Sequence, residues 1–253
     1  MRFSKALVGL AAIAAATVFL SGCCAWGGRV STGVGGVPRE RITGSFKMAS
    51  QDYDLDGFTG VEAMSAFAVE IVPSDQYEVK VTANENVLDH VEVQVEGDVL
   101  KFSLPSGYTF TNIRLTAEVG MPELALVKLS GASRATLKGK WKTERFEARL
   151  SGASNMKGDV TADEMLLNVS GSSRIELDGA AARLEAESSG ASALELGGLE
   201  AVAAQINLSG ASRGTLDVTD RLDAHLSGAS RLEYGGSPVV NSDVSGGSTL
   251  RKR

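Results

Sequence analysis

Cysteine and histidine are nearly absent from this chain of 253 residues, which contains two of each. The cysteines are adjacent, at Cys23 and Cys24, and this excludes a disulfide-stapled body and a cysteine-rich metal site. The histidines, His90 and His225, are far apart in the sequence, and neither belongs to a catalytic or zinc-binding motif. The sequence therefore favours a protein without enzymatic activity and without a cofactor.

An excess of basic residues is also missing, because 25 lysines and arginines stand against 31 aspartates and glutamates. This balance gives a net charge of −6 and excludes nucleic acid as a partner. Aromatic residues make up only 6% of the chain, whereas glycine occurs 29 times. Narrow coils that turn tightly need small residues at their corners, and this composition is typical of them.

The apolar run at the N-terminus, Ala6 to Leu20, is too short to span a membrane. It follows two basic residues, which is the layout of a secretory signal. The run ends in Leu20-Ser21-Gly22-Cys23, which resembles the lipobox of bacterial lipoproteins, where cleavage precedes a cysteine that becomes lipid-modified. We expect residues 1–22 to be a signal peptide and Cys23 to carry the lipid, such as palmitate. An ordinary signal beside a chance cysteine is the alternative.

Residue 24 is cysteine rather than aspartate, and this bears on the membrane to which the lipid would attach. By resemblance to enterobacterial sorting, nothing retains such a protein at the inner membrane. The sequence therefore predicts a cell-envelope protein in the outer membrane, on its periplasmic face or at the cell surface.

A six-residue phrase close to Leu-Ser-Gly-Ala-Ser-Arg recurs seven times in the second half of the chain. The first serines of the copies are Ser130, Ser151, Ser170, Ser189, Ser209, Ser227 and Ser245, in steps of 21, 19, 19, 20, 18 and 18 residues. A repeat of this length is too short to bury a hydrophobic face alone, so neighbouring copies must stack. The spacing predicts a solenoid.

Apolar residues alternate with polar ones around the phrase, as in Met165, Leu167 and Val169 before one copy and Ile175 after it. An alternation with period two indicates strands. Each coil would hold two strands joined at a corner, where glycine adopts positive φ and serine hydroxyls bond to nearby backbone groups. The sequence predicts an all-β fold, a single-stranded parallel β-helix (β-solenoid) of about seven regular coils over residues 121–253. The first serines would stack into one hydroxyl column.

Two further segments precede the repeats. Residues 23–56 are rich in glycine and acidic residues and predict a flexible tether. Residues 57–120 lack the phrase but contain strand-like runs separated by turns such as Pro105-Ser106-Gly107. We expect these runs to be irregular opening coils that cap the N-terminal end of a domain spanning residues 57–253, because an uncapped end invites edge-to-edge aggregation.

These segments together resemble one known family, described as "putative auto-transporter adhesin, head GIN domain". The similar stretches, over about residues 57–250, are Gly57-Phe58-Thr59-Gly60-Val61-Glu62, Val69-Glu70-Ile71, Tyr77 to Glu85, Val99-Leu100-Lys101-Phe102, Met121-Pro122-Glu123-Leu124 and the Ser-Gly-Ala-Ser series. The family is a domain of unknown function in exported bacterial proteins. The resemblance implies a right-handed β-helix without established chemistry and assigns no functional residue.

One short motif suggests a metal. Asp52, Asp54 and Asp56, followed by Gly57, match the first half of a calcium loop, in which alternating carboxylates surround the ion. The second half of the calcium loop is not matched, because alanine, Ala63, occupies the position of the glutamate that would bind the ion with both oxygens. The sequence favours a solvated acidic linker over a calcium site, and it predicts no other metal.

Arginine is the last residue of the phrase in four copies, at Arg134, Arg174, Arg213 and Arg231. Residues two apart on a strand share a face, and the position two residues further on is a glutamate in some coils, such as Glu176. Two interpretations remain open. The arginines form ion pairs across coils, which the sequence favours, or they form with the serines a strip that binds an acidic glycan, because guanidinium groups suit carboxylates.

Carbohydrate-cleaving enzymes need two carboxylates about 5 to 10 Å apart, and the aspartates of the repeats form no recurring pair. The sequence therefore predicts a non-enzymatic, lipid-anchored envelope protein whose solenoid binds or scaffolds, in the manner of an adhesin. Its partners would be the membrane, through the lipid, and an envelope protein or glycan. An acidic-glycan-binding module that uses the arginine and serine columns, and a polysaccharide-degrading β-helix enzyme, are the alternatives.

Overall fold

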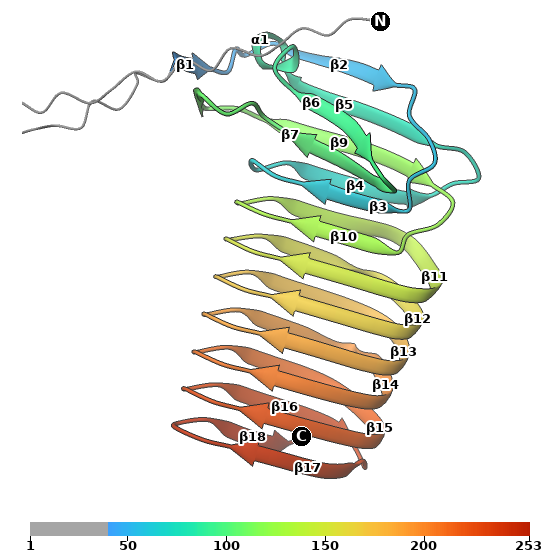
Figure 1. Ribbon diagram of the computed structural model, residues 1–253, viewed down its shortest axis with the longest axis vertical. Helices are drawn as coiled ribbons and strands as arrows, with labels where there is room; N and C mark the ends of the chain where they lie inside the picture. Colours follow the sequence, from blue (N-terminus) through green and yellow to red (C-terminus); the bar gives the residue numbers. More distant parts are fainter. Residues whose placement is uncertain (1–39) are drawn as a thin grey trace, which may run out of the picture. The chain divides into compact units, whose positions relative to one another are not determined.

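The computed structural model describes residues 40–253, which form a stack of parallel β-coils with a modified N-terminal end (Figure 1). Each of the five longest strands makes up most of one coil and pairs in parallel with the next: β11 (Arg134–Leu150), β12 (Asn155–Val169), β13 (Arg174–Ser188), β14 (Ala193–Leu208) and β15 (Arg213–Leu226). The short strand β10 (Leu126–Leu129) precedes them on one side of the stack. The final coils are completed by β16 (Arg231–Gly236), β17 (Val239–Val244) and β18 (Thr249–Lys252).

The coils wind in a right-handed sense, as the chain in Figure 1 shows from β10 downwards. Two faces flank the Ser-Gly-Ala-Ser corner. The lead-in face consists of the segments that run into the corner, such as residues 145–150, and the lead-out face consists of those that leave it, such as residues 134–137. The prediction of an all-β, right-handed parallel β-solenoid of about seven turns is confirmed.

The core lies between the two faces and is built from the alternating apolar residues of each coil. Leu167 and Ile206 are each 1% exposed and occupy the same inward column, and Phe146, Met165 and Leu184 form another such column. Because each coil turns back on itself, the two faces bury their apolar columns against one another. The alternation in the sequence therefore gives the correct inward residues.

Glycine is required at the corner for two separate reasons. Gly171 has φ of +77°, a conformation that costs a side chain strain. A Cβ atom on Gly171 would also lie 2.4 Å from the carbonyl oxygen of Gly152 in the preceding coil. That oxygen accepts a hydrogen bond from the Ser172 amide at 2.8 Å, so the corners are joined to each other by their own backbone ladder.

The second serine of the phrase, rather than the first, closes the corner. Ser212 is fully buried, and its Oγ donates to the carbonyl oxygen of Ser209 at 2.8 Å. Ser154, Ser192 and Ser230 make the same bond three residues back, at 2.7 to 2.8 Å. These hydroxyls satisfy carbonyl groups at the point where the chain leaves the sheet.

The N-terminal end continues both faces and then reverses the strand direction. On the lead-in face, β10 pairs in parallel with β3 (Gly60–Ala63) and β3 with β7 (Val99–Ser103), to which β6 (Glu92–Glu96) is antiparallel. On the lead-out face, β11 pairs in parallel with β4 (Ala68–Pro73) and β4 with β9 (Leu115–Met121), followed by antiparallel β5 (Glu78–Asn84) and β2 (Met48–Tyr53). The predicted irregular capping strands are therefore present.

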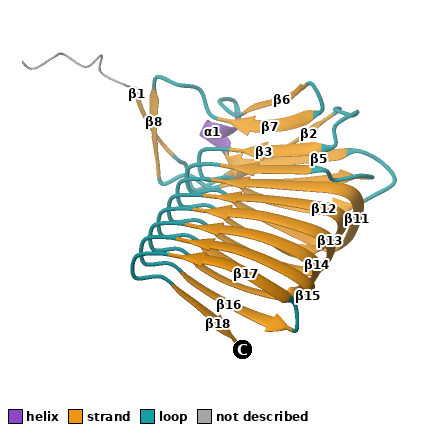
Figure 2. Cartoon of the chain, turned by 60° about the horizontal axis from the view of Figure 1, so that its bottom comes forward, coloured by secondary structure: helices purple, strands orange, loops and turns teal. Residues whose placement is uncertain are grey.

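The remaining elements lie at the same end. A separate two-stranded parallel sheet joins β1 (Glu40–Thr43) to β8 (Tyr108–Thr111), and the short helix α1 (Glu85–Leu88) follows β5 (Figure 2). Among the described residues, no helix is long and apolar enough to cross a membrane. The predicted signal peptide and the lipidation site Cys23 lie outside the described residues.

The predicted boundary between tether and domain needs correction. Residues 23–56 were expected to form a flexible tether, but β2 pairs along its whole length with β5 and belongs to the folded unit. The sequence gives little sign of this strand, because β2 lies at the edge of the sheet and contains no fully buried residue. An edge strand of this kind does not need the apolar alternation by which inner strands are recognised.

Candidate functional site

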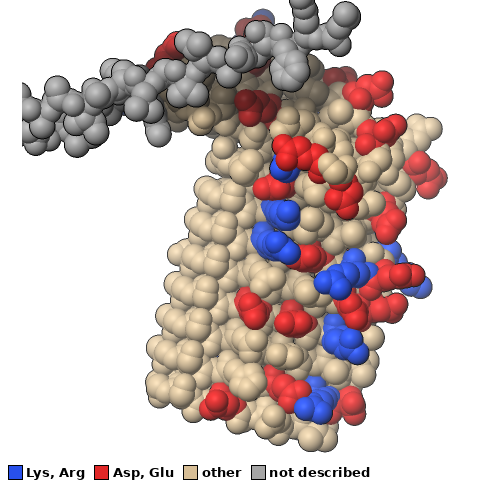
Figure 3. All heavy atoms as spheres, viewed as in Figure 1, with Lys and Arg blue, Asp and Glu red and all other residues tan. Residues whose placement is uncertain are grey.

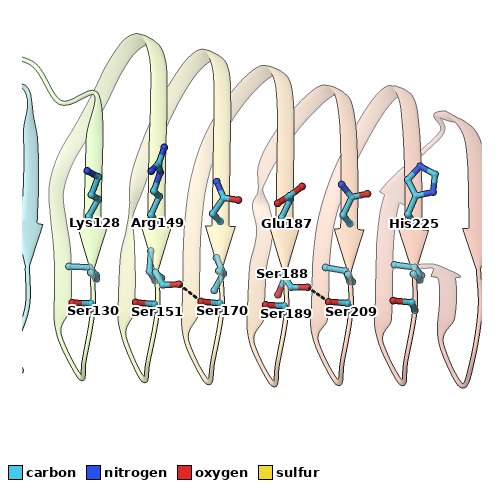
Figure 4. Close-up of a pocket in the computed structure, with 18 of the residues that line it drawn as sticks. Lys128, Ser130, Arg149, Ser151, Ser170, Glu187, Ser188, Ser189, Ser209 and His225 are labelled. Atoms are coloured by element: carbon cyan, nitrogen blue, oxygen red, sulfur yellow. Dashed lines mark hydrogen bonds between the residues drawn. The ribbon is translucent and has the colours of Figure 1, made fainter. Parts of the chain in front are cut away.

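A groove of about 750 Å³ runs along the lead-in face beside the corners and crosses the coils from β10 to β17 (Figure 4). We call this groove the furrow. Its serine wall consists of the first serines of the phrase, Ser130, Ser151, Ser170, Ser189, Ser209, Ser227 and Ser245. Its polar wall consists of Lys128, Arg149, Asn168, Glu187, Asn207, His225 and Asp243. Its floor is the backbone of residues whose side chains turn into the core, Leu129, Leu150, Val169, Ser188, Leu208 and Leu226.

The furrow follows from the alternation of the strands. Residues two apart, such as Arg149 and Ser151, project from the same face about 7 Å apart, while Leu150 between them turns inward. The register carries each of these positions directly onto its equivalent in the next coil, for example Arg149 onto Asn168 and Asn168 onto Glu187. Each wall is therefore a column of side chains spaced about 4.8 Å apart.

The serine wall presents hydroxyl groups that are only weakly engaged. Ser170 and Ser209 donate to the carbonyl oxygens of Leu150 and Ser188 at 3.3 and 3.4 Å, which are long hydrogen bonds (Figure 4). Ser245 makes a similar bond at 3.3 Å. The hydroxyls of Ser130, Ser151, Ser189 and Ser227 bond to no other described residue. A serine hydroxyl can both donate and accept, so this wall offers hydrogen bonds to a ligand in every coil.

The polar wall is positively charged at its N-terminal end. Lys128 and Arg149 occupy neighbouring coils there. The Nζ atom of Lys128 lies 4.0 Å from a carboxylate oxygen of Glu62, and Arg149 forms an ion pair with Glu147 on its own strand. Both cations remain partly exposed along the furrow.

Beyond its N-terminal end the polar wall contains two carboxylates, Glu187 at the middle of the wall and Asp243 at its C-terminal end. Asp223, two residues before His225, adds another carboxylate to the same face. A hydrogen bond from Arg221 holds the pKa of Asp223 below its ordinary value, and Asn241 donates to the same carboxylate at 3.2 Å. The charge of the furrow therefore changes sign along its length.

The inward-pointing column beneath the furrow contains one polar residue, Ser188. The equivalent positions in the neighbouring coils are Val169 and Leu208. Ser188 is 3% exposed, and its Oγ has no hydrogen-bond partner among the described residues (Figure 4). A buried hydroxyl left unpaired costs about 1 to 3 kcal/mol, so Ser188 makes the core beneath the furrow less stable than a valine or leucine would.

The furrow contains groups that hydrolases use, but their arrangement does not match catalysis. His225 stands in the polar wall near Ser227 and one coil from Asp243, yet no hydrogen bond joins it to either among the described residues. A catalytic serine needs such a contact with its base. Glu187 and Asp243 are three coils apart, about 14 Å, which exceeds the 5 to 10 Å that glycosidases use. His90 lies elsewhere, in an aromatic cluster with Tyr108.

The four arginines that the sequence singled out lie on the lead-out face and not in the furrow. Arg174 forms an ion pair with Glu195 of the next coil, at 2.6 Å between Nη2 and Oε1. Arg134, Arg213 and Arg231 are exposed and form no ion pair with another described residue. The corner separates these arginines from the serine wall, so the combined strip of arginines and serines that the sequence suggested does not form.

The calcium candidate is not assembled into a site. Asp52 belongs to β2, and Asp52, Asp54 and Asp56 are all exposed. Asp52 and Asp54 border a second groove of about 780 Å³ on the lead-out side of the N-terminal end, together with Glu70 and Glu118. Among residues 40–253, no group of three or more acidic, histidine or cysteine side chains is close enough to hold a metal ion.

Figure 3 views the lead-in face and shows its corner edge free of charged side chains, with lysines, arginines, aspartates and glutamates over the rest of the face. The polar wall was not predicted from the sequence. A signal was present, because the position two residues before the first serine is polar in all seven copies, from Lys128 to Asp243. An alignment of the copies on their serines makes this column visible.

The model of one family, described as "Putative auto-transporter adhesin, head GIN domain", matches residues 57–238 of the chain. Among solved structures, a "putative adhesin" from Bacteroides fragilis is 20% identical with a TM-score of 0.77, and the match covers 84% of this chain and 100% of that one. A "putative lipid binding protein" from Parabacteroides distasonis is 20% identical with a TM-score of 0.69, covering 85% and 100%. At this identity the likeness concerns the fold. No curated protein matches the chain.

Proposed function

The chain belongs to the family of auto-transporter adhesin head GIN domains, and from this premise we propose that it is a non-enzymatic binding protein of the bacterial cell envelope. A lipid on Cys23 would hold the protein at the outer membrane, and the furrow would bind an envelope or surface ligand. The names of the similar structures, which are called putative adhesins in several cases, agree with a role in attachment.

The furrow is the observation that carries this proposal. It is a continuous polar groove formed by consecutive coils, and it contains hydroxyl, amide and charged groups that can bind but no paired groups that can catalyse. Binding sites combine a concave surface with a few converging polar groups, and the furrow meets that description. A polysaccharide-degrading enzyme would instead need carboxylates facing each other across the groove.

Blocking the furrow tests the proposal. Ser209→Tyr places a bulky ring in the serine wall of a central coil, and we expect it to reduce the retention of the purified protein on isolated envelope material at least tenfold. Thr215→Tyr puts the same ring on the lead-out face of the same coil and should leave retention unchanged.

Circular dichroism and thermal melts of both variants check that the fold persists. Equal retention of both variants, with the fold intact, would contradict a binding role for the furrow. Release of soluble sugars from the envelope material by the wild-type protein would favour the enzyme alternative.

A further inference from the structure

We propose that the C-terminal end of the stack binds a second copy of this chain, with β17 and β18 of one copy joined to β18 and β17 of the other. This contact does not depend on what the furrow binds. Its consequence for membranes rests on the proposed lipid at Cys23. The open strand edges, the exposed apolar residues and the charges of the last coil support it.

Both strands of the last coil have an open edge. Among the described residues, β17 pairs only with β15 and β18 only with β16. The amides of Ser245 and Thr249 donate to carbonyl oxygens of the preceding coil at 2.9 Å. Because backbone groups alternate in direction along a parallel strand, Val244 and Leu250 direct theirs towards the open end. Such an edge is a template for another strand.

The inward columns of the core end in apolar side chains that nothing further along the stack covers. Val244 follows Leu208 and Leu226 in one column, and those leucines are each 2% exposed, whereas Val244 is 42% exposed. Leu250 follows the buried Leu232 on the lead-out face and is only partly buried. A coil stacked on this end would cover both side chains, and the burial of apolar surface favours such association.

The charges of the last coil identify the partner as a second copy. Asp243 on β17 and Arg251 on β18 are exposed and point away from the core. β17 runs into the corner and β18 leaves it, so a twofold axis through the corner at Gly247 sets β17 antiparallel to the partner's β18. Asp243 then lies opposite the partner's Arg251, where side chains of an antiparallel ladder come closest. Val244 lies opposite the partner's Leu250, so apolar residues match in the same register.

The contact closes on itself. A twofold axis repeats each interaction, so the pair contains two contacts between Asp243 and Arg251, and assembly stops at two copies. The other twofold arrangement sets β18 against the partner's β18. It brings Arg251, Lys252 and Arg253 of both copies together, which opposes association. In the favoured register Lys252 lies opposite the partner's Ser242 at the margin of the contact, where its long side chain keeps the amine in water.

The position of the contact has a consequence at membranes. The chain enters the folded unit through β1, at the end opposite to β17 and β18 (Figure 1). Two joined copies therefore have their β1 strands at the two far ends of the pair, and lipids on Cys23 would attach them to two different membranes. The end of a single coil is a small interface, so we expect a Kd of about 10 to 100 µM. Many copies on facing surfaces would add their weak contacts.

Charge reversal tests the contact in solution. The full chain with Cys23→Ala, which carries no lipid, is measured by analytical ultracentrifugation over a concentration range that spans the expected Kd. We expect Asp243→Arg and Arg251→Asp each to weaken self-association at least tenfold, because each contact then joins like charges. A mixture of the two variants should associate as the wild type does, since each variant supplies the charge that the other lacks.

Two control variants keep this result specific. Glu187→Arg makes the same kind of change in a central coil, and Ser209→Tyr alters the furrow, so both should associate as the wild type does. Thermal melts check that every variant keeps its fold. A wild-type protein that stays monomeric throughout the range, or a mixture that associates no better than its separate variants, would overturn the proposal.

Phosphatidylcholine vesicles that carry the lipidated protein test the connection between membranes. By light scattering we expect wild-type vesicles to cluster and vesicles with Asp243→Arg or Arg251→Asp alone to stay dispersed. Mixing the two sets of variant vesicles should restore clustering. Association in solution without clustering of vesicles would overturn the connection between membranes and leave the contact between copies. Neither measurement involves the furrow, so a failure here leaves the binding role of the furrow untouched.

Discussion

Gly171 and Gly57 both adopt positive φ, at +77° and +72°, but only one of them touches a neighbouring coil. A Cβ atom on Gly57 would have no other atom within 4 Å. A Cβ atom on Gly171 would lie against the carbonyl oxygen of Gly152. At the scale of single residues, the repeated glycine is therefore as much a packing requirement as a conformational one. The sequence identifies the turn, but the contact between corners becomes visible only when the coils are stacked.

The two glycines separate these contributions experimentally. Gly57→Ala should cost about 1 to 2 kcal/mol, the strain of a left-handed alanine, as measured by urea unfolding. Gly171→Ala should cost about 1 to 3 kcal/mol more, because the corner must shift to accommodate the methyl group. Equal costs at the two positions would show that adjacent corners are not in contact.

At the scale of elements, each strand of the stack points adjacent side chains alternately into the core and out towards solvent. In β12, Leu167 is 1% exposed and points into the core, whereas Leu166 is half-buried on the lead-in face. The two leucines have the same chemistry and are neighbours in the chain. They therefore form a matched pair for testing the register.

We expect Leu167→Ala to cost about 2 to 5 kcal/mol, because it leaves a cavity between the faces. Leu166→Ala should cost less than about 1 kcal/mol, since its side chain is already partly in water. Urea melts of the two variants decide the point. A larger effect at Leu166 would mean that Leu166, and not Leu167, points into the core.

The inner strands could be predicted from the sequence because burial on one face imposes alternation, as in Met165, Leu167 and Val169. Strand β2 could not, because an edge strand buries little and carries no such pattern. The same limit applies to the furrow. Its serine wall was visible as a repeated hydroxyl, but the groove between the serine wall and the polar wall exists only when the coils stack in register.

At the scale of the whole molecule, the proposal requires that one lipidated cysteine fixes the protein to its membrane. Cys23→Ala should move the protein from the membrane fraction into the soluble fraction, because no second anchor is proposed. Cys24→Ala changes the adjacent cysteine and should leave the protein in the membrane fraction. Immunoblots of fractionated cells measure this. Sedimentation of Cys23→Ala with membranes, as for the wild type, would contradict lipid anchoring at this residue.

The backbone hydrogen bonds between coils, such as that from the Ala191 amide to the Gly171 carbonyl at 2.8 Å, all run along the axis of the stack. A mechanical pull on one end of the chain along this axis would therefore separate the outermost coil first and the next coils one after another. Each coil that peels away releases about 19 residues, or about 60 Å of extended chain. Under tension the domain would therefore unfold coil by coil and lengthen in steps of one coil.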